Sequence, residues 1–198
     1  MDETWNERYA SEEYIYGTEA NEYLKEKLQS LAAGKILLPA EGEGRNAVYA
    51  ATLGWDVFAF DQSTVGREKA LKLAATKNVT ITYDIAEFED ADYPEHSFDA
   101  LALIYAHVPF QLRAQYYSKL FSFLKPGGML ILEGFSKEQT KFNSGGPRDA
   151  SMLFSESELK EILSDMNILE LATIETTLQE GNYHEGKASV VRLFAKNK

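Results

Sequence analysis

The chain has 198 residues, of which 44% are hydrophobic and 26% are charged, as expected for one globular domain. It has no cysteine, which excludes disulfides, thiol nucleophiles and cysteine-ligated zinc. Its net charge of -11 disfavours a nucleic-acid partner, because a polyanion would have to overcome that field. No apolar stretch approaches the ~20 residues of a membrane span and the acidic N-terminus lacks a leader pattern, so we expect a soluble, cytoplasmic protein that binds no membrane.

Helices and strands alternate along the first 135 residues. Leucines spaced four and three residues apart predict a helix over residues 18–33, which Gly34 ends. A buried strand is expected from Lys35 to Pro39, followed by a glycine turn and a helix over 45–53. The same patterns predict further strands over 55–60, 79–83, 98–105 and 129–133, with helices over 64–76 and 109–124.

The last third of the chain has a different pattern. Residues 136–152 resemble a loop, and Ser155 opens a helix with the spacing of a capping box to Glu158. Two strands are then expected over 167–178 and 187–196, joined by the short loop 179–186 as an antiparallel hairpin. The whole pattern predicts the α/β class, with a Rossmann-like, seven-stranded, mostly parallel sheet that ends in this hairpin.

Polar residues and a glycine turn fall at the carboxyl ends of the predicted strands, the edge where ligands bind on such sheets. Gly42 and Gly44 allow a tight turn ahead of a helix N-terminus, although such a turn alone is equally compatible with plain chain reversal. Asp61 ends the second strand, at the spacing where dinucleotide-binding folds place an acid for ribose hydroxyls. Asp84 ends the third strand, where it could accept from an adenine amino group. The alternative for both aspartates is a helix cap or turn.

The joint order of these motifs resembles that of class I S-adenosylmethionine-dependent methyltransferases, especially the tellurite-resistance and thiopurine-type branch of small-molecule enzymes. The resemblance extends over nearly the whole chain. The segments that carry it are Trp5–Tyr9, Tyr16-Gly17, Gly42–Ala51, Phe58–Asp61, Asp84, Ser97–Asp99, Leu124–Gly128 and Glu180–Gly186.

The resemblance implies S-adenosylmethionine as cofactor and assigns roles to the strand ends. The turn of Ala40, Glu41, Gly42 and Gly44 would contact its methionine part. Asp61 would hold the ribose with Gln62 beside the adenine, Asp84 and the Ile85 backbone would read the adenine edge, and Tyr105 would approach the methyl end. In one departure, Leu38 and Ala40 stand where the family has an acid and a glycine. Either Glu41 would then replace the acid at the cofactor's amino group, or backbone carbonyls would suffice there.

An oxygen or nitrogen acceptor would benefit from a base, for which histidine is suited near neutral pH. His107 follows the fourth strand, with packing as its alternative role, and His184 lies in the hairpin loop, with solvent exposure as its alternative. His96 is expected at the surface. Arg148 could bind an anionic acceptor through its planar guanidinium or be an ordinary surface cation. Tyr16 could join Tyr9 and Tyr14 in an aromatic lid over the sulfonium, or these rings could pack the N-terminal segment.

We therefore expect methyl transfer to a small-molecule acceptor, with His107, His184, Tyr16 and Arg148 as catalytic candidates and no metal site. Residues 1–33 would form a cap and helix, 34–135 the cofactor-binding core, and 136–198 the acceptor side. The pocket would be closed by residues 1–17, 136–150 and 179–186. A non-catalytic module with a methyltransferase fold is the alternative. Ala47 at the third glycine position does not exclude a nicotinamide dehydrogenase, but the terminal hairpin and the Pro126-Gly127-Gly128 turn favour a methyltransferase.

Overall fold

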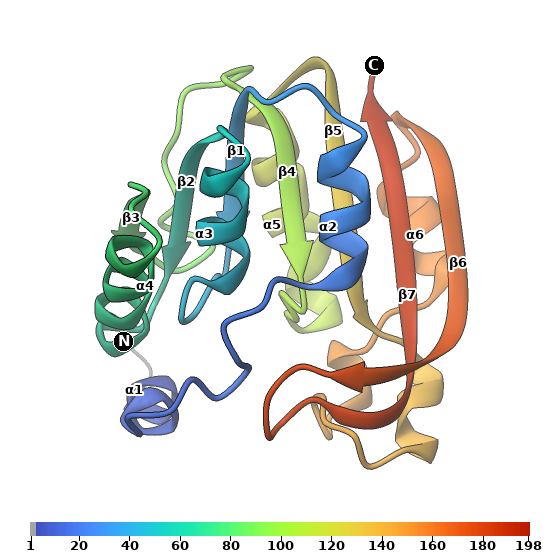
Figure 1. Cartoon of the computed structure of the whole chain (residues 1–198). Helices are drawn as coiled ribbons and strands as arrows, with labels where there is room; N and C mark the ends of the chain where they lie inside the picture. The colour runs from blue at the N-terminus through green and yellow to red at the C-terminus, as the bar shows by residue number, and fades with distance from the viewer. Residues whose placement is uncertain (1–2) are drawn as a thin grey trace.

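A seven-stranded sheet forms the centre of the computed structural model, which describes residues 3–198 (Figure 1). The strand order is β3-β2-β1-β4-β5-β7-β6. Strands β1 to β5 run parallel, and β7 pairs antiparallel with both β5 and β6. This confirms the predicted mostly parallel sheet with a C-terminal hairpin. The strands are β1 (Lys35–Pro39), β2 (Asp56–Asp61), β3 (Thr82–Ile85), β4 (Phe98–Ile104), β5 (Leu124–Phe135), β6 (Met166–Gln179) and β7 (Glu185–Asn197).

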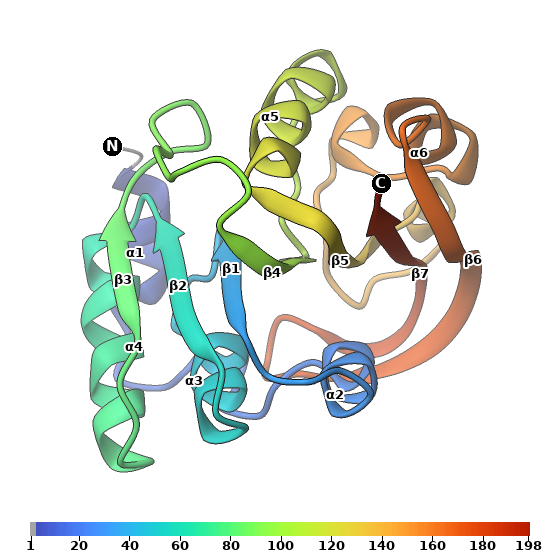
Figure 2. The same ribbon diagram turned by 90° about the horizontal axis from the view of Figure 1, so that it is seen from above.

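Helices cover both faces of the sheet, as strand–helix alternation predicts. Seen from above, α2 and α3 lie on one face, and α5 and α6 lie on the other (Figure 2). No helix within residues 3–198 has the length and apolarity needed to cross a bilayer. The helices are α1 (Glu3–Tyr9), α2 (Glu22–Gln29), α3 (Arg45–Thr52), α4 (Thr64–Thr76), α5 (Phe110–Ser122) and α6 (Glu156–Ile162), with short 3-10 helices at Lys137–Lys141 and Ala150–Met152.

The core is divided by the sheet into two layers, because successive side chains of a strand point to opposite faces. In β1, Leu37 packs into the layer that contains α5, whereas Ile36 and Leu38 pack into the layer that contains α2 and α3. All three side chains are fully buried. This two-sided burial explains why β1 has a continuous apolar run rather than an alternating one.

The structure differs from the sequence-based elements mainly at their ends. The helix expected over 18–33 is limited to Glu22–Gln29, because the Asn21 side chain caps it by accepting from the Leu24 amide at 3.0 Å. Helix α1 was not expected, and its Tyr9 is buried. The predicted capping box is half formed. Ser155 accepts from the Glu158 amide at 3.4 Å, but the Glu158 carboxylate pairs with buried Arg113 instead of returning to the cap.

Candidate functional site

A cavity of about 860 Å³ opens at the carboxyl ends of β1, β2, β4 and β5. In Figure 1 this edge lies below the arrowheads of the parallel strands, where α1, the β6–β7 turn and the segment after β5 gather. All three regions expected to close the pocket contribute residues to its wall, the first of them from residue 5 onward. Residues 1–2 of that region lie outside the described part of the chain.

Most of the predicted site residues line this cavity. They are Tyr16, Ala40, Glu41, Gly42, Asp61, Gln62, Tyr105, His107, Arg148 and His184. Gly44, Asp84 and Ile85 do not line it. The topology therefore brings together the glycine turn, the end of β2, the end of β4 and the hairpin loop, but not the end of β3.

The glycine turn is shaped by contacts from three directions. Gly42 has φ 58°, and a Cβ there would lie 2.6 Å from the Tyr9 hydroxyl. Its carbonyl accepts from the Tyr83 hydroxyl at 2.6 Å, and its amide donates to Asp61 Oδ2 at 3.0 Å. Gly44 has φ 85°, and a Cβ there would lie 2.4 Å from Ala70 Cβ. Gly42 is thus needed at the cavity wall, whereas Gly44 allows α3 to approach α4.

Ala40 and Glu41 connect β1 to the glycine turn. Ala40 has φ 53°, a left-handed conformation that normally favours glycine. Glu41 is buried, and its Oε1 accepts from the amides of Asn46 at 2.8 Å and Ala47 at 2.7 Å, so the carboxyl group caps the N-terminus of α3. Burial raises the pKa of Glu41 to about 7, against the lowering effect of these hydrogen bonds. Glu41 is therefore an acid of the cavity wall with a pKa close to neutrality.

Asp61 joins the end of β2 to the glycine turn. Its Oδ1 accepts from the Ser63 amide at 2.8 Å, while Oδ2 holds the Gly42 amide. Burial raises the pKa of Asp61, and the hydrogen bonds from Ser63, Gly42 and Gln62 oppose that effect. An ionised carboxylate has about four acceptor positions. These amide bonds therefore leave acceptor capacity on Asp61, which lines the cavity beside Gln62.

The end of β3 points away from the cavity. Asp84 Oδ2 accepts from the Tyr93 hydroxyl at 2.8 Å, and Ile85 is 39% exposed. Because β3 is the edge strand, the chain leaves the sheet there and Phe88 forms the cavity wall instead. The adenine contacts expected of Asp84 and Ile85 remain a prediction.

His184 lies in an aromatic box at the cavity wall. Its ring centroid is 4.6 Å from that of Tyr16, 4.5 Å from that of Tyr105 and 5.1 Å from that of Phe135. His184 is only 6% exposed, so the alternative that it is a solvent-exposed loop residue is wrong. Burial lowers the pKa of His184, although the nearby Glu180 carboxylate raises it. The imidazole is therefore neutral at neutral pH.

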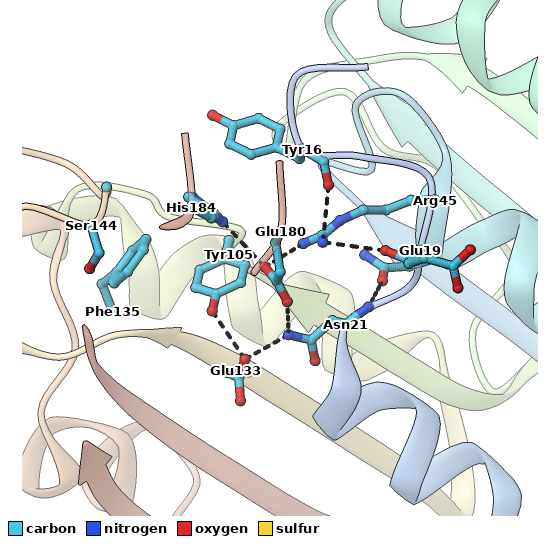
Figure 3. A network of polar contacts seen from close by, with 12 residues as sticks. Tyr16, Glu19, Asn21, Arg45, Tyr105, Glu133, Phe135, Ser144, Glu180 and His184 are labelled. Carbon is cyan, nitrogen blue, oxygen red and sulfur yellow. Dashed lines mark hydrogen bonds and ion pairs between the residues drawn. The ribbon is translucent and has the colours of Figure 1, made fainter. Parts of the chain in front are cut away.

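A buried polar network supports this histidine (Figure 3). His184 Nδ1 lies 3.3 Å from Glu180 Oε2, which also accepts from Arg45 Nη2 at 2.9 Å. Asn21 Nδ2 donates to Glu180 Oε1 at 2.8 Å and to Glu133 Oε1 at 2.6 Å. Burial opposes ionisation of Glu180, but the bonds from His184 and Arg45 outweigh it and hold its pKa at about 2. The hairpin turn, α3, β5 and the N-terminal segment are thus tied around one carboxylate.

His107 is engaged on both ring nitrogens. Nδ1 lies 2.8 Å from the Met152 carbonyl oxygen and so donates to it, while Nε2 accepts from the Phe135 amide at 3.2 Å. Burial lowers the pKa of His107 to about 3. With no free lone pair, this side chain is not arranged as a proton acceptor, and the geometry favours its packing alternative.

The N-terminal aromatic residues divide between the two roles considered for them. Tyr16 lines the cavity, and its hydroxyl accepts from Arg8 Nη1 at 3.5 Å. Tyr9 lines the cavity but is buried, whereas the Tyr14 hydroxyl donates to the Lys69 carbonyl at 3.0 Å and packs on α4. His96 is exposed, as expected, and does not line the cavity.

Sequence reasoning missed the residues that hold the closing segments in place. Glu43 Oε2 accepts from the Ile15 amide at 2.8 Å, and its Oε1 lies 2.5 Å from Lys69 Nζ. Arg45 pairs with Glu180 across a separation of 135 positions along the chain. The available signal was a charged residue on either side of Gly44, in a turn that otherwise needs only small residues.

Comparison with protein families gives one matching domain. Residues 36–128 match the family model described as a methyltransferase domain, a range that contains the glycine turn, Asp61 and Tyr105. None of the curated proteins compared with the chain matches it.

Solved structures resemble the chain over most of its length. One, from a study of the conversion of a disulfide bond into a thioacetal group during echinomycin biosynthesis, has a TM-score of 0.78 at 15% identity and covers 99% of this chain and 92% of its own. TehB from Haemophilus influenzae has a TM-score of 0.75 at 19% identity, over 90% of this chain and 63% of its own. Magnesium protoporphyrin IX methyltransferase from Synechocystis PCC 6803, solved with bound SAH, has a TM-score of 0.69 at 14% identity. The match covers 88% of this chain and 81% of that protein. At these identities the likeness concerns the fold.

Proposed function

We propose that this chain, an S-adenosylmethionine-dependent methyltransferase with the class I fold, transfers the methyl group to a small-molecule acceptor beside His184. The observation that carries the proposal is the aromatic box around a neutral histidine at the wall of the cavity. Three separate segments close over this cavity. Such an enclosed space suits a small molecule better than a macromolecular chain.

The residues of the glycine turn and the end of β2 fit the cofactor. The cavity volume of about 860 Å³ lies within the ~300–1,000 Å³ typical of ligand sites. Asp61 has the acceptor capacity to hold two vicinal hydroxyls, and Gln62 lies next to it. Glu41 lines the cavity beside Gly42 and could hold the cofactor's amino group, which would favour the ionised form of Glu41. When bound, the cofactor supplies a methyl group on a positively charged sulfur, which keeps the electron pair of the broken carbon–sulfur bond.

The protein's own part is to position the acceptor and remove its proton. Since Glu180 accepts only, the hydrogen of His184 is on Nδ1, and Nε2 has a free lone pair. A proton leaving an oxygen, nitrogen or sulfur acceptor would move to Nε2, and the ionised Glu180 would stabilise the resulting imidazolium. Tyr16, Tyr105 and Phe135 exclude water from this reaction.

Two finer assignments follow from the same reasoning. We place the chain in the small-molecule branch with the tellurite-resistance and thiopurine-type enzymes, supported by its ordered motifs and by the similarity to TehB. We also assign residues 34–135 to cofactor binding, and the segment 136–198 with the N-terminal residues to the acceptor side. Tyr105 at the end of β4 lies at the junction of the two, because it lines the cavity and packs against His184.

The test is to supply methyl-labelled cofactor with a panel of thiols, phenols, amines and chalcogen oxyanions, and in parallel with protein and nucleic-acid mixtures. We expect label in at least one small molecule. For a protonated acceptor, H184A should lower the rate by ~10²–10⁴, the usual contribution of a general base, while binding of S-adenosylhomocysteine is retained. Label found only in macromolecules would contradict the proposal.

A further inference from the structure

The charged side chains of the cavity separate by sign. The acids that line it are Glu41, Glu43 and Asp61, and all three come from the glycine turn or the end of β2. The cations that line it are Arg8, Arg45 and Arg148. Arg45 is neutralised by Glu180 at 2.9 Å, which leaves two arginines from the closing segments. Within residues 3–198, no acidic residue of the cavity wall comes from these closing segments.

Arg148 belongs to the wall next to His184. Two residues before it, a Cβ at Gly146 would lie 2.7 Å from the Phe135 ring. One residue earlier, a Cβ at Gly145 would lie 2.8 Å from His184 Cδ2. The loop thus runs in close contact with two members of the aromatic box immediately before it presents Arg148 to the cavity.

Arg8 approaches the same part of the wall from the N-terminal segment. Its Nη1 lies 3.5 Å from the hydroxyl of Tyr16, a member of the box, and its guanidinium carbon lies 5.8 Å from the ring centroid of Tyr183, the neighbour of His184. The guanidinium is also 4.7 Å from the Trp5 ring centroid. Stacking of this kind keeps the charge in place and leaves donors available.

Arg148 differs from the other arginines in its partners. Across residues 3–198, it alone among the arginines makes no hydrogen bond, ion pair or ring contact. This occurs in a chain with 31 acidic residues and a net charge of -11, where a carboxylate partner would be easy to supply. Arg148 is an exposed residue that also lines the cavity, so it lies at the cavity mouth with its donors free. A guanidinium in that position is suited to an incoming carboxylate or other oxyanion.

We propose that the methyl acceptor is an anion whose carboxylate or equivalent oxyanion is bound by Arg148, with Arg8 adding positive potential from the opposite segment. The inference rests on the proposed function, since it names the chemical class of the acceptor at that site. The nucleophilic atom would lie beside His184, and the anionic group would lie toward the mouth of the cavity.

Binding of charge-matched pairs tests the inference without requiring turnover. The protein is saturated with S-adenosylhomocysteine and titrated by calorimetry with 4-hydroxybenzoate against 4-hydroxybenzamide, and with 3-mercaptopropionate against 3-mercaptopropionamide. We expect at least one acid to bind ~10-fold or more tightly than its amide, the usual effect of a charge-assisted contact. R148Q should abolish this preference and R148K should retain part of it. K72Q, which removes the same charge from an exposed position of α4 outside the cavity, should leave it unchanged.

Three results would overturn the inference. One is equal binding of acid and amide in both pairs, and another is the absence of binding by either acid. The third is a loss of S-adenosylhomocysteine affinity in R148Q, because the arginine would then serve the cofactor. Failure of wild-type protein to bind S-adenosylhomocysteine is a separate result, which would contradict the proposed function itself.

Discussion

The Nδ1 atom of His184 lies 3.3 Å from Oε2 of Glu180, and the same carboxylate oxygen is bound by Arg45. This relationship determines which ring nitrogen carries the hydrogen. It also explains why the hairpin turn packs on the N-terminal segment, since Glu180 holds Asn21 as well. The histidine and its orientation therefore depend on the same buried contacts.

The pH dependence of the reaction should reflect this pair. A base must be neutral, and burial lowers the pKa of His184, so the rate should rise with pH through a pKa below 6.5 and be level above it. Because Glu180 raises that pKa, E180Q should move the acidic limb to still lower pH and reduce kcat by ~10-fold through lost orientation. The pH–rate profile should be measured with an acceptor whose own pKa lies outside this range. An acidic limb that moves to higher pH in E180Q would contradict the assignment.

Cofactor affinity should depend on Asp61 far more than on Asp84. D61N removes a charged acceptor that organises the glycine turn and faces the cavity, so we expect S-adenosylhomocysteine to bind ~10–100-fold more weakly by calorimetry. D84N alters a carboxylate that bonds to Tyr93 outside the cavity and should change affinity less than ~3-fold. A large loss in D84N would instead support the adenine contact predicted for that residue.

The packing of the hairpin turn on the N-terminal segment should be sensitive to one methyl group. A Cβ at Gly181 would lie 2.3 Å from the Ile15 carbonyl oxygen, so G181A should push the two segments apart and weaken S-adenosylhomocysteine binding. G54A is a matched control, since Gly54 also has a positive φ but has nothing within 4 Å of the added carbon. We expect G54A to lower the free energy of unfolding by ~1–2 kcal/mol and leave cofactor affinity unchanged. Equal effects of the two variants on affinity would show that the contact is unimportant.

Acid stability should report on His107. Its folded-state pKa of about 3 lies below the 6.5 of an unperturbed histidine, so its contribution to stability is present above pH 6.5 and is lost as the pH falls toward 3. H107Q should lower the free energy of unfolding at pH 7 by ~1–3 kcal/mol, through disturbed hydrogen bonds, and should flatten its decline between pH 6.5 and 3. Chemical denaturation at several pH values measures both effects. An unchanged slope in this variant would contradict the buried neutral state.

Glu41 should have the opposite dependence. Burial raises the folded-state pKa of Glu41 from 4.5 to about 7. The contribution of Glu41 to the free energy of unfolding is therefore present below pH 4.5 and is lost as the pH rises through 7. E41Q should therefore flatten the decline in stability between pH 4.5 and 7, whereas D56N, a change at the exposed Asp56, should leave it as in wild type. A decline in E41Q as steep as that of the wild type would contradict the raised pKa.

Periodic patterns were sufficient for the sheet and most of the helices. The continuous apolar run at 36–38 predicted a strand buried on both faces, and its side chains are divided between both core layers. The limits of α2 were missed because Asn21 acts as a cap, which depends on a local side-chain hydrogen bond rather than on periodicity. Helix α1 was missed because a helix of seven residues depends on tertiary packing rather than on its own pattern.

The site was predictable where strand ends dictate it and not where distant segments meet. Asp61 and the glycine turn follow from their positions after β2 and β1. The Glu180 network could not be predicted, because Glu180 is joined with Asn21, Arg45 and Glu133, and the four residues come from separate parts of the chain. The two cavity histidines also looked alike in sequence. The backbone contacts on both ring nitrogens of His107 distinguish it from His184, whose Nε2 has no hydrogen-bond partner among residues 3–198.

The most direct test of the account is a crystal structure of the protein with S-adenosylhomocysteine. We predict that the ribose hydroxyls lie within hydrogen-bond distance of Asp61, and that the sulfur lies at the Tyr105 end of the cavity, toward His184. A ligand bound elsewhere, or an Asp61 side chain turned away from a filled cavity, would contradict the central claim that this strand edge holds the cofactor.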